Sequence, residues 1–519
     1  MTESDKVQPS YTNQLGKRPR NQLTVTSFSE KSFIEEVKRA SCVNDDAWAP
    51  NTQTLYLGKY LHSLGAKTLV IERHYIDRHF MEEVSLYYSK NLLPRQNWTT
   101  RIHIFSEPID HFSIEKSIQD AIAGHQKDVS QQLQKAYRGY IVIRPLPSVP
   151  IGRTVLNHLG DKLTPKFPTC YQYPVHFLGF ELHVKGIAFQ QQDRAVAACA
   201  TTAIWTALQR VMRREGARPP TSWEITEAAV QHYLPHGRPY PSSGLTSEQM
   251  CEALRYFGFA PDVLRVFKSP DEFRLLMSIY LQSGIPVILS FGDKYEQHAV
   301  TVVGYSESEP KNFKISKNSD DSYSLAIHGL AFDQIFIHDD RLGPYALAKF
   351  EIDKRTDNQG EQYDQLIISI VWPDGKTETA DVQMAAIPLY PKLRSSAKEL
   401  FETATEHIPI IQKAFIDQQK PLGLYLYFER SGEYQSSLYD KNVDPKRIVE
   451  FQQSIALSRY IGVHRWYLGN KPVMETIWDT TDTMRETKFH ECLLGVVCLD
   501  ETHRDFVDGF AKLFDAIPG

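Results

Sequence analysis

Residues 198–214 have the sequence ACATTAIWTALQRVMRR, and this stretch decides the fold of the middle of the chain. Its first charged side chain is Arg210, about three helical turns after Cys199. A helix that is apolar all round is stable only when other elements cover it. We therefore predict a buried helix that begins near Cys199 and ends near Arg214.

The segments after this helix change to short apolar runs separated by turns, which indicates strands. We predict strands at residues 286–291, 298–305, 334–338, 345–351, 363–372 and 382–389. The polar stretch 306–324 is predicted to be a surface insertion, and residues 339–344 (DDRLGP) a loop. Together these elements predict an α+β fold in which the helix packs against an antiparallel sheet.

The length of the chain, 519 residues, predicts two to four domains at roughly 150 residues each. We expect a flexible tail at residues 1–25 and a mixed α/β domain at 26–180. The domain of the buried helix follows at 181–392, and an α+β domain occupies 393–519. The chemistry is expected in the domain at 181–392, because the other two show no comparable arrangement of reactive side chains.

The composition argues against two classes of partner. Lys and Arg total 58 against 63 for Asp and Glu, so the net charge of -5 provides no basic field for nucleic acid or for an anionic membrane surface. The longest apolar runs, at 366–372 and 493–499, are far shorter than the roughly 20 residues of a membrane-spanning helix. We expect neither a nucleic-acid partner nor a membrane.

The cysteines form no CxxC pair, which fits neither a disulfide scaffold nor a zinc site. They are Cys42, Cys170, Cys199, Cys251, Cys492 and Cys498. The first thirty residues contain no apolar segment of the kind that a secretory signal requires. We therefore expect a cytoplasmic protein with reduced thiols, no metal and no organic cofactor.

Three side chains occur in the order and context that catalysis by a thiol requires. Cys199 opens the predicted helix, where the positive end of the helix dipole favours a thiolate. His298 opens a predicted strand and could serve as acid and base, and Asp339 follows another strand and could orient the imidazole. We predict a catalytic triad of Cys199, His298 and Asp339, with Asp340 as the alternative orienting acid.

Three segments carry a resemblance to a known family: QQQDRAVAACATTAIW at 190–205, QHAVTVVGY at 297–305 and IFIHDDRLGPY at 335–345. They resemble the papain-like cysteine peptidase superfamily, and within it the bacterial branch similar to bacteriocin-leader-processing (double-glycine leader) peptidases. The resemblance covers about 200 of the 519 residues. It implies a papain-like peptidase core at 181–392, flanked by mixed α/β domains.

The resemblance also implies an upstream glutamine that donates a hydrogen bond to the oxyanion. Gln192 precedes Cys199 by seven residues and Gln191 by eight, whereas the commoner spacing of six falls on Asp193. Gln192 is favoured, with Gln191 as the alternative, and the backbone amide of Cys199 would be the second donor. The nucleophile lies in Ala-Cys-Ala, where the branch often has Asp-Cys-Gly.

Other conspicuous side chains have ordinary structural explanations. Glu72, His74 and His79 could be imagined as metal ligands, but histidines at helix edges more often cap the helix or face solvent. His338 points to the opposite face of its strand from its neighbours and is predicted to be structural. Trp205 is predicted to pack in the core.

The activity implied by the resemblance is hydrolysis of peptide bonds in a protein or peptide substrate through a thioester acyl-enzyme. The same triad could instead transfer the acyl group to an amine, as transglutaminase-like enzymes do, because water and amines attack the same intermediate. The third interpretation is a non-catalytic pseudopeptidase scaffold. The flanking domains could select the substrate or bind a regulatory protein partner.

Overall fold

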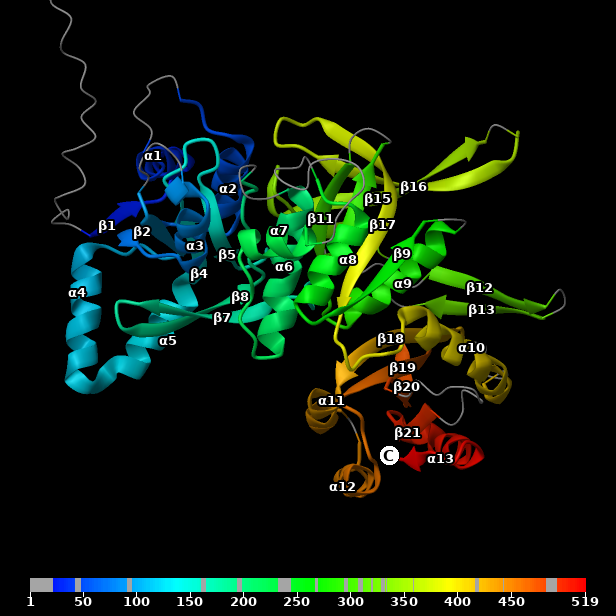
Figure 1. The fold of residues 1–519 in the computed structure, drawn as a ribbon. Coiled ribbons are helices and arrows are strands. Elements are labelled where there is room, and N and C mark those ends of the chain that lie inside the picture. The colour runs from blue at the N-terminus through cyan, green and yellow to red at the C-terminus, as the bar shows by residue number, and fades with distance from the viewer. Residues whose placement is uncertain are drawn as a thin grey trace, which may run out of the picture.

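The computed structural model describes residues 22–42, 48–90, 96–159, 165–193, 198–231, 244–266, 269–293, 297–306, 311–318, 321–327, 332, 334–357, 359–415, 420–441, 443–481 and 492–519. The architecture is α+β, as the sequence predicts, and its sheets are mainly antiparallel (Figure 1). The predicted tail at 1–25 lies outside the described residues as far as residue 21, and residues 23–25 belong to the first strand.

The N-terminal unit is an antiparallel sheet covered on one face by two helices. Its strands pair in the order β1 (Leu23–Ser27), β2 (Thr68–Tyr75), β3 (Thr99–Phe105), β4 (Tyr137–Ile143) and β5 (Ile151–Leu156). Leu69 and Ile71 pack against helices α1 (Glu30–Ala40) and α2 (Thr52–Ser63), whereas Val70 joins the core on the other face. The connections contain α3 (Arg78–Leu86), α4 (His111–Asp120) and α5 (Gln126–Ala136).

A hairpin links this unit to the centre of the molecule. Its strands, β7 (Tyr171–Phe177) and β8 (Phe180–Gly186), pair antiparallel along their whole length, and the expected boundary between residues 180 and 181 falls at the start of β8. Val175 and Leu182 lie opposite each other in the hairpin, and their buried side chains share a core with the central helix. The hairpin therefore contacts both units.

The central sheet is antiparallel and closes on itself. Strand β10 pairs with β17 as well as with β11, so six strands form a closed ring of hydrogen-bonded neighbours. They are β10 (Val287–Gly292), β11 (Gln297–Ser306), β14 (Gln334–Asp339), β15 (Gly343–Thr356), β16 (Gln362–Val371) and β17 (Thr377–Leu389). All six predicted strands are confirmed, but the closure of the ring is not visible in the sequence.

Two further strands extend this sheet. β9 (Ala260–Arg265) pairs with β17, and β6 (Pro165–Lys166) pairs with β11. β9 is not predicted from the sequence, because Pro261 and Asp262 interrupt its apolar pattern. Such residues are tolerated on an edge strand, where one side of the backbone needs no ladder partner.

The predicted buried helix is confirmed as α6 (Cys199–Arg214), and every residue from Ala200 to Gln209 is buried. It packs on β11, where the Thr301 hydroxyl donates a 2.8 Å hydrogen bond to the carbonyl of Ala203. Three helices surround this core: α7 (Ser222–Ala229), α8 (Ser247–Tyr256) and α9 (Pro270–Gln282). The active-site candidates thus lie on a buried helix and on the strands that it contacts.

The C-terminal unit is a second mixed layer of helices and strands (Figure 1). Its sheet has the order β12 (Lys311–Asn318), β13 (Asp321–Ile327), β18 (Leu422–Arg430), β19 (Tyr460–Leu468), β20 (Lys471–Asp479), β21 (Leu493–Cys498) and β22 (Ile517–Pro518). The helices are α10 (Ala397–Ala414), α11 (Ser431–Ser437), α12 (Pro445–Ser454) and α13 (Arg504–Leu513).

The stretch 306–324, predicted as a polar surface insertion, contributes to this C-terminal sheet. β12 and β13 pair antiparallel as a hairpin, and β13 pairs in parallel with β18 through Ala326 and Ile327. The polar composition of 306–324 hid these strands, because it lacks the apolar alternation by which strands are predicted. Among the described residues, no helix has the length and apolar content needed to cross a membrane.

Candidate active site

Cys199 is the first residue of α6, and its side chain is half-buried. Ala198 before it is extended, and its amide donates a 3.3 Å hydrogen bond to the Thr201 hydroxyl, which fixes the entry of the chain into the helix. The first turn of a helix carries backbone N–H groups without intrahelical acceptors and forms the positive end of the dipole. Cys199 therefore lies at the positive end of the α6 dipole.

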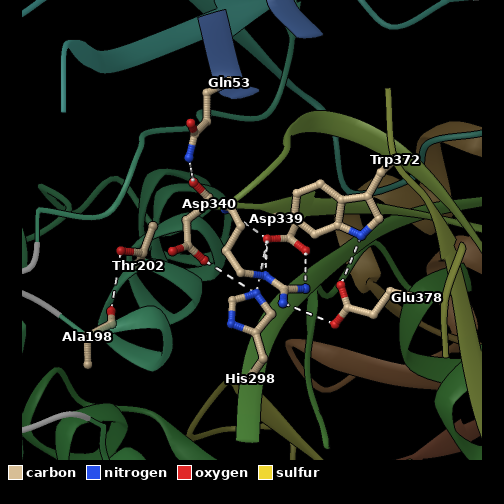
Figure 2. Close-up of polar contacts among 9 residues, drawn as sticks. Gln53, Ala198, Thr202, His298, Asp339, Asp340, Trp372 and Glu378 are labelled. Carbon is tan, nitrogen blue, oxygen red and sulfur yellow. Dashed lines mark hydrogen bonds and ion pairs between the residues drawn. The ribbon is translucent and has the colours of Figure 1, made fainter. Parts of the chain in front are cut away.

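His298 lies on β11, the strand that contacts α6. Its Nε2 is 3.0 Å from Oδ1 of Asp339, the last residue of β14, and β14 is the neighbour of β11 in the sheet (Figure 2). The Cys199 side chain is close enough to the imidazole to be among the groups that raise its pKa. The structure thus brings the three residues predicted as a triad together.

Asp339 is completely buried and is held by a second cation that sequence analysis missed. Arg341 contacts both carboxylate oxygens: its backbone amide lies 2.8 Å from Oδ1, and its Nη2 lies 3.0 Å from Oδ2. Glu378 accepts from the other side of the guanidinium at 3.1 Å and from the Trp372 indole at 3.0 Å (Figure 2). These contacts fix the rotamer of Asp339, because each oxygen has a donor in addition to His298.

Asp340, the alternative orienting residue, lies farther from the imidazole. Its Oδ1 is 3.6 Å from His298 Nε2, which exceeds the 3.0 Å of Asp339. Its backbone carbonyl accepts a 2.7 Å hydrogen bond from the side chain of Gln53 on α2, and the Tyr56 hydroxyl donates to the carbonyl of Pro344 at 2.9 Å. The N-terminal unit therefore fixes the backbone of the loop after the triad acid.

The charges at the site favour a protonated imidazole. Burial alone would lower the pKa of His298, but the charge and hydrogen bond of Asp339, the hydrogen bond of Cys199 and the charge of Asp340 outweigh it and raise this pKa to about 10. Burial would raise the pKa of Asp339, yet the imidazolium and Arg341 hold it below its ordinary range. Burial raises the pKa of Asp340 to about 6, since the His298 charge offsets only part of the penalty.

We expect the ring of His298 to remain protonated to about pH 10, well above its ordinary value of 6.5. The stability that this raised pKa contributes is present in full below pH 6.5 and is lost as the pH rises through about 10. NMR titration of ¹³C-labelled histidine, with the signal assigned by His298→Ala, measures the pKa directly. Asp339→Asn should lower it strongly and Asp340→Asn only slightly; titration of the wild-type ring near 6.5 would contradict the assignment.

The two candidate glutamines before Cys199 have different surroundings. Gln191 is buried, and its Oε1 accepts a 3.3 Å hydrogen bond from the amide of Ile151, so its side chain is engaged by β5. Gln192 is half-buried, and its role as the oxyanion donor stays a prediction. Asp193, at the spacing of six, is buried and accepts a hydrogen bond from the Tyr88 hydroxyl.

The remaining polar candidates have structural roles. His338 is buried, and its ring packs edge-on against Tyr345 with centroids 4.8 Å apart. The Trp205 indole is fully buried and donates a 3.3 Å hydrogen bond to Nδ1 of His79, while Glu72 pairs with Arg101. These findings agree with the structural roles predicted for His338 and Trp205.

A metal ion has one conceivable set of ligands among the described residues. His298, Asp339 and Asp340 each offer one ligand atom, and these atoms lie within 4.8 Å of one another. The Arg341 guanidinium contacts both oxygens of Asp339, so a cation there would face a fixed positive charge at close range. The donor set therefore fits the imidazolium of His298 better than a metal.

This geometry defines a class of site in which a thiol, an imidazole and a carboxylate lie one beside the next. The site lies where a buried helix contacts an antiparallel sheet. The chain matches no protein-family model, and no curated protein matches it. The assignment of function therefore rests on the site itself.

Proposed function

We propose that this protein is a papain-like cysteine peptidase that hydrolyses peptide bonds in a protein or peptide substrate. The observation that carries the proposal is the 3.0 Å contact of His298 Nε2 with Asp339, on an imidazole whose pKa the nearby Cys199 side chain helps to raise. A thiol at a helix N-terminus beside an oriented imidazolium is activated as a nucleophile. Nothing in this chemistry requires a metal or an organic cofactor.

The reaction follows from the positions of these groups. The Cys199 thiolate attacks the peptide carbonyl carbon, and the negative charge that develops on its oxygen is met by the Cys199 amide and the Gln192 side chain. His298 donates its proton to the leaving amine, and the C–N bond breaks to give a thioester. Water then attacks the thioester and gives its proton to His298, which releases the acid product and regenerates the thiolate and imidazolium pair.

The flanking units fit a role in substrate selection. Gln53 and Tyr56 of the N-terminal unit hold the loop after Asp339, so a partner that moves α2 would also move the loop of the triad. We propose that the flanking domains select the substrate or receive a regulatory protein. The contacts of Gln53 and Tyr56 with the loop after Asp339 support such a role for the N-terminal unit.

Alkylation of Cys199 tests the proposal without a known substrate. Iodoacetamide at pH 6 should modify Cys199 at least tenfold faster than Cys251, which is also half-buried and whose pKa is raised by burial. His298→Ala should remove this advantage, because the thiolate loses its counter-ion. Peptide mass mapping of timed samples measures both rates in one chain, so Cys251 serves as the internal control.

Two results would contradict the proposal. If Cys199 reacts no faster than Cys251, the thiol is an ordinary buried group and the chain is a non-catalytic scaffold. If Cys199 is reactive but its products gain the mass of an amine instead of water, the enzyme is an acyltransferase. The mass of the product distinguishes these outcomes from peptide hydrolysis.

A further inference from the structure

A polar cavity lies between the central and C-terminal units, at the far end of the helix that carries Cys199. It has a volume of about 340 Å³ and is lined by α6, by the turn after α9, and by β18, β19 and α11 of the C-terminal unit. This volume is within the range of small-molecule sites. Arg210 and Arg214 of α6 line it. Arg210 is eleven residues after Cys199, about 16 Å along the helix axis, so the cavity is separate from the triad.

The walls of this cavity carry more cations than carboxylates can neutralise. Lys441 and Arg465 both pair with one carboxylate, that of the fully buried Glu475, each at 2.7 Å. Arg214 pairs with Glu433 at the rim. Lys441 and Arg465 thus share a single carboxylate, whereas the charges of Arg214 and Glu433 balance each other.

Arg210 adds a cation that no carboxylate of the described residues contacts directly. Among the described residues it forms no hydrogen bond and no ion pair, and its guanidinium lies over the ring of Tyr171, 5.9 Å from the centroid. Burial and the nearby Arg214 lower the pKa of Arg210, an effect that Tyr390 and Glu433 only partly offset, whereas the pKa of the paired Arg465 is raised. Arg210 is half-buried and its buried Nε has no partner, so an anion from solution could pair with this guanidinium.

Glu429 is the carboxylate in the cavity wall that no described cation contacts. It lies on β18, and burial raises its pKa to about 7. Even when it is ionised, the cavity retains a net positive charge, because four cations face the three carboxylates of Glu429, Glu433 and Glu475. The aromatic side chains of Tyr425 and Phe428 supply apolar surface beside these charges.

We propose that this cavity binds a small organic anion, whose carboxylate or phosphate group pairs with the Arg210 guanidinium. The apolar surface of β18 contacts the rest of the ligand. This binding site does not depend on the peptidase chemistry, because none of its residues belongs to the triad.

Isothermal titration of the full-length chain at constant ionic strength tests the site, with succinate and inorganic phosphate as probes. At least one probe should bind saturably with a stoichiometry of one, and the preferred probe identifies the anionic group. Arg210→Met should weaken binding at least tenfold. Arg213→Gln, which removes a charge from the same helix outside the cavity, should leave binding unchanged. Binding that saturates for neither probe, or equal affinities of Arg210→Met and wild type, would overturn the proposal.

Glu429→Gln provides an independent test, should Arg210→Met fail to fold. Removing this carboxylate deletes a repulsive charge next to the anion, so affinity should rise at least threefold at pH 8. An unchanged affinity would show that the anion is bound elsewhere. Because both titrations measure binding, their failure would leave the alkylation result at Cys199 untouched.

Discussion

Asp339→Asn is expected to lower kcat on the order of 10²- to 10⁴-fold, while Asp340→Asn changes it by less than about tenfold. Asp339 is the acid at 3.0 Å from the imidazole, and Arg341 fixes its orientation through both oxygens. An amide in its place keeps the shape but loses the charge that stabilises the imidazolium. Asp340 lies 3.6 Å from the same nitrogen and lacks comparable support.

A library of proteome-derived peptides supplies the substrate for this measurement. Peptides that the wild-type chain cleaves are identified by mass spectrometry, and one of them is used to compare the variants. Asp340→Asn is the matched control, since it removes one carboxylate of the same type from the adjacent position. A larger loss in Asp340→Asn than in Asp339→Asn would assign the orienting role to Asp340.

Trp205→Ala is expected to reduce the free energy of unfolding by about 3–5 kcal/mol, the usual cost of deleting a large buried ring. Trp205 is completely buried on α6, six residues after Cys199, and touches His79 of the N-terminal unit. Its loss leaves a cavity between α6 and α3. Urea unfolding followed by circular dichroism measures the change.

Trp205→Phe is the control for this prediction. It retains most of the apolar volume and loses the indole hydrogen bond, so its cost should be only about 1–2 kcal/mol. If the two variants were equally stable, the ring would not be packed as the structure describes.

The sequence predicts the parts of this structure that depend on local pattern. The bounds of α6 follow from an uncharged run that ends in arginines, and β10, β11 and β14 follow from apolar runs between turns. Cys199, His298 and Asp339 were predicted because each stands at the end of such an element. The structure brings them together because α6 packs on β11 and β14, which are neighbours in the sheet.

The parts that could not be predicted depend on contacts between distant residues. Gln53 reaches the carbonyl of Asp340 across 287 positions of the chain, and no local pattern indicates that contact. Arg341 was visible two residues after Asp339, and a buried carboxylate commonly needs a second donor, so its role could have been inferred. The closure of the central sheet depends on the pairing of β10 with β17, which only the folded chain shows.

Because β13 pairs in parallel with β18, a segment from the middle of the chain belongs to the sheet of the C-terminal unit. During synthesis the β12–β13 hairpin leaves the ribosome before β18 exists, so its edge has no partner until the last quarter of the protein is made. A protease that nicks the chain at 390–396 would leave two fragments joined through this strand pair, and they should still elute as one particle. Removing residues 393–519 would instead uncover the edge of β13 and invite self-association.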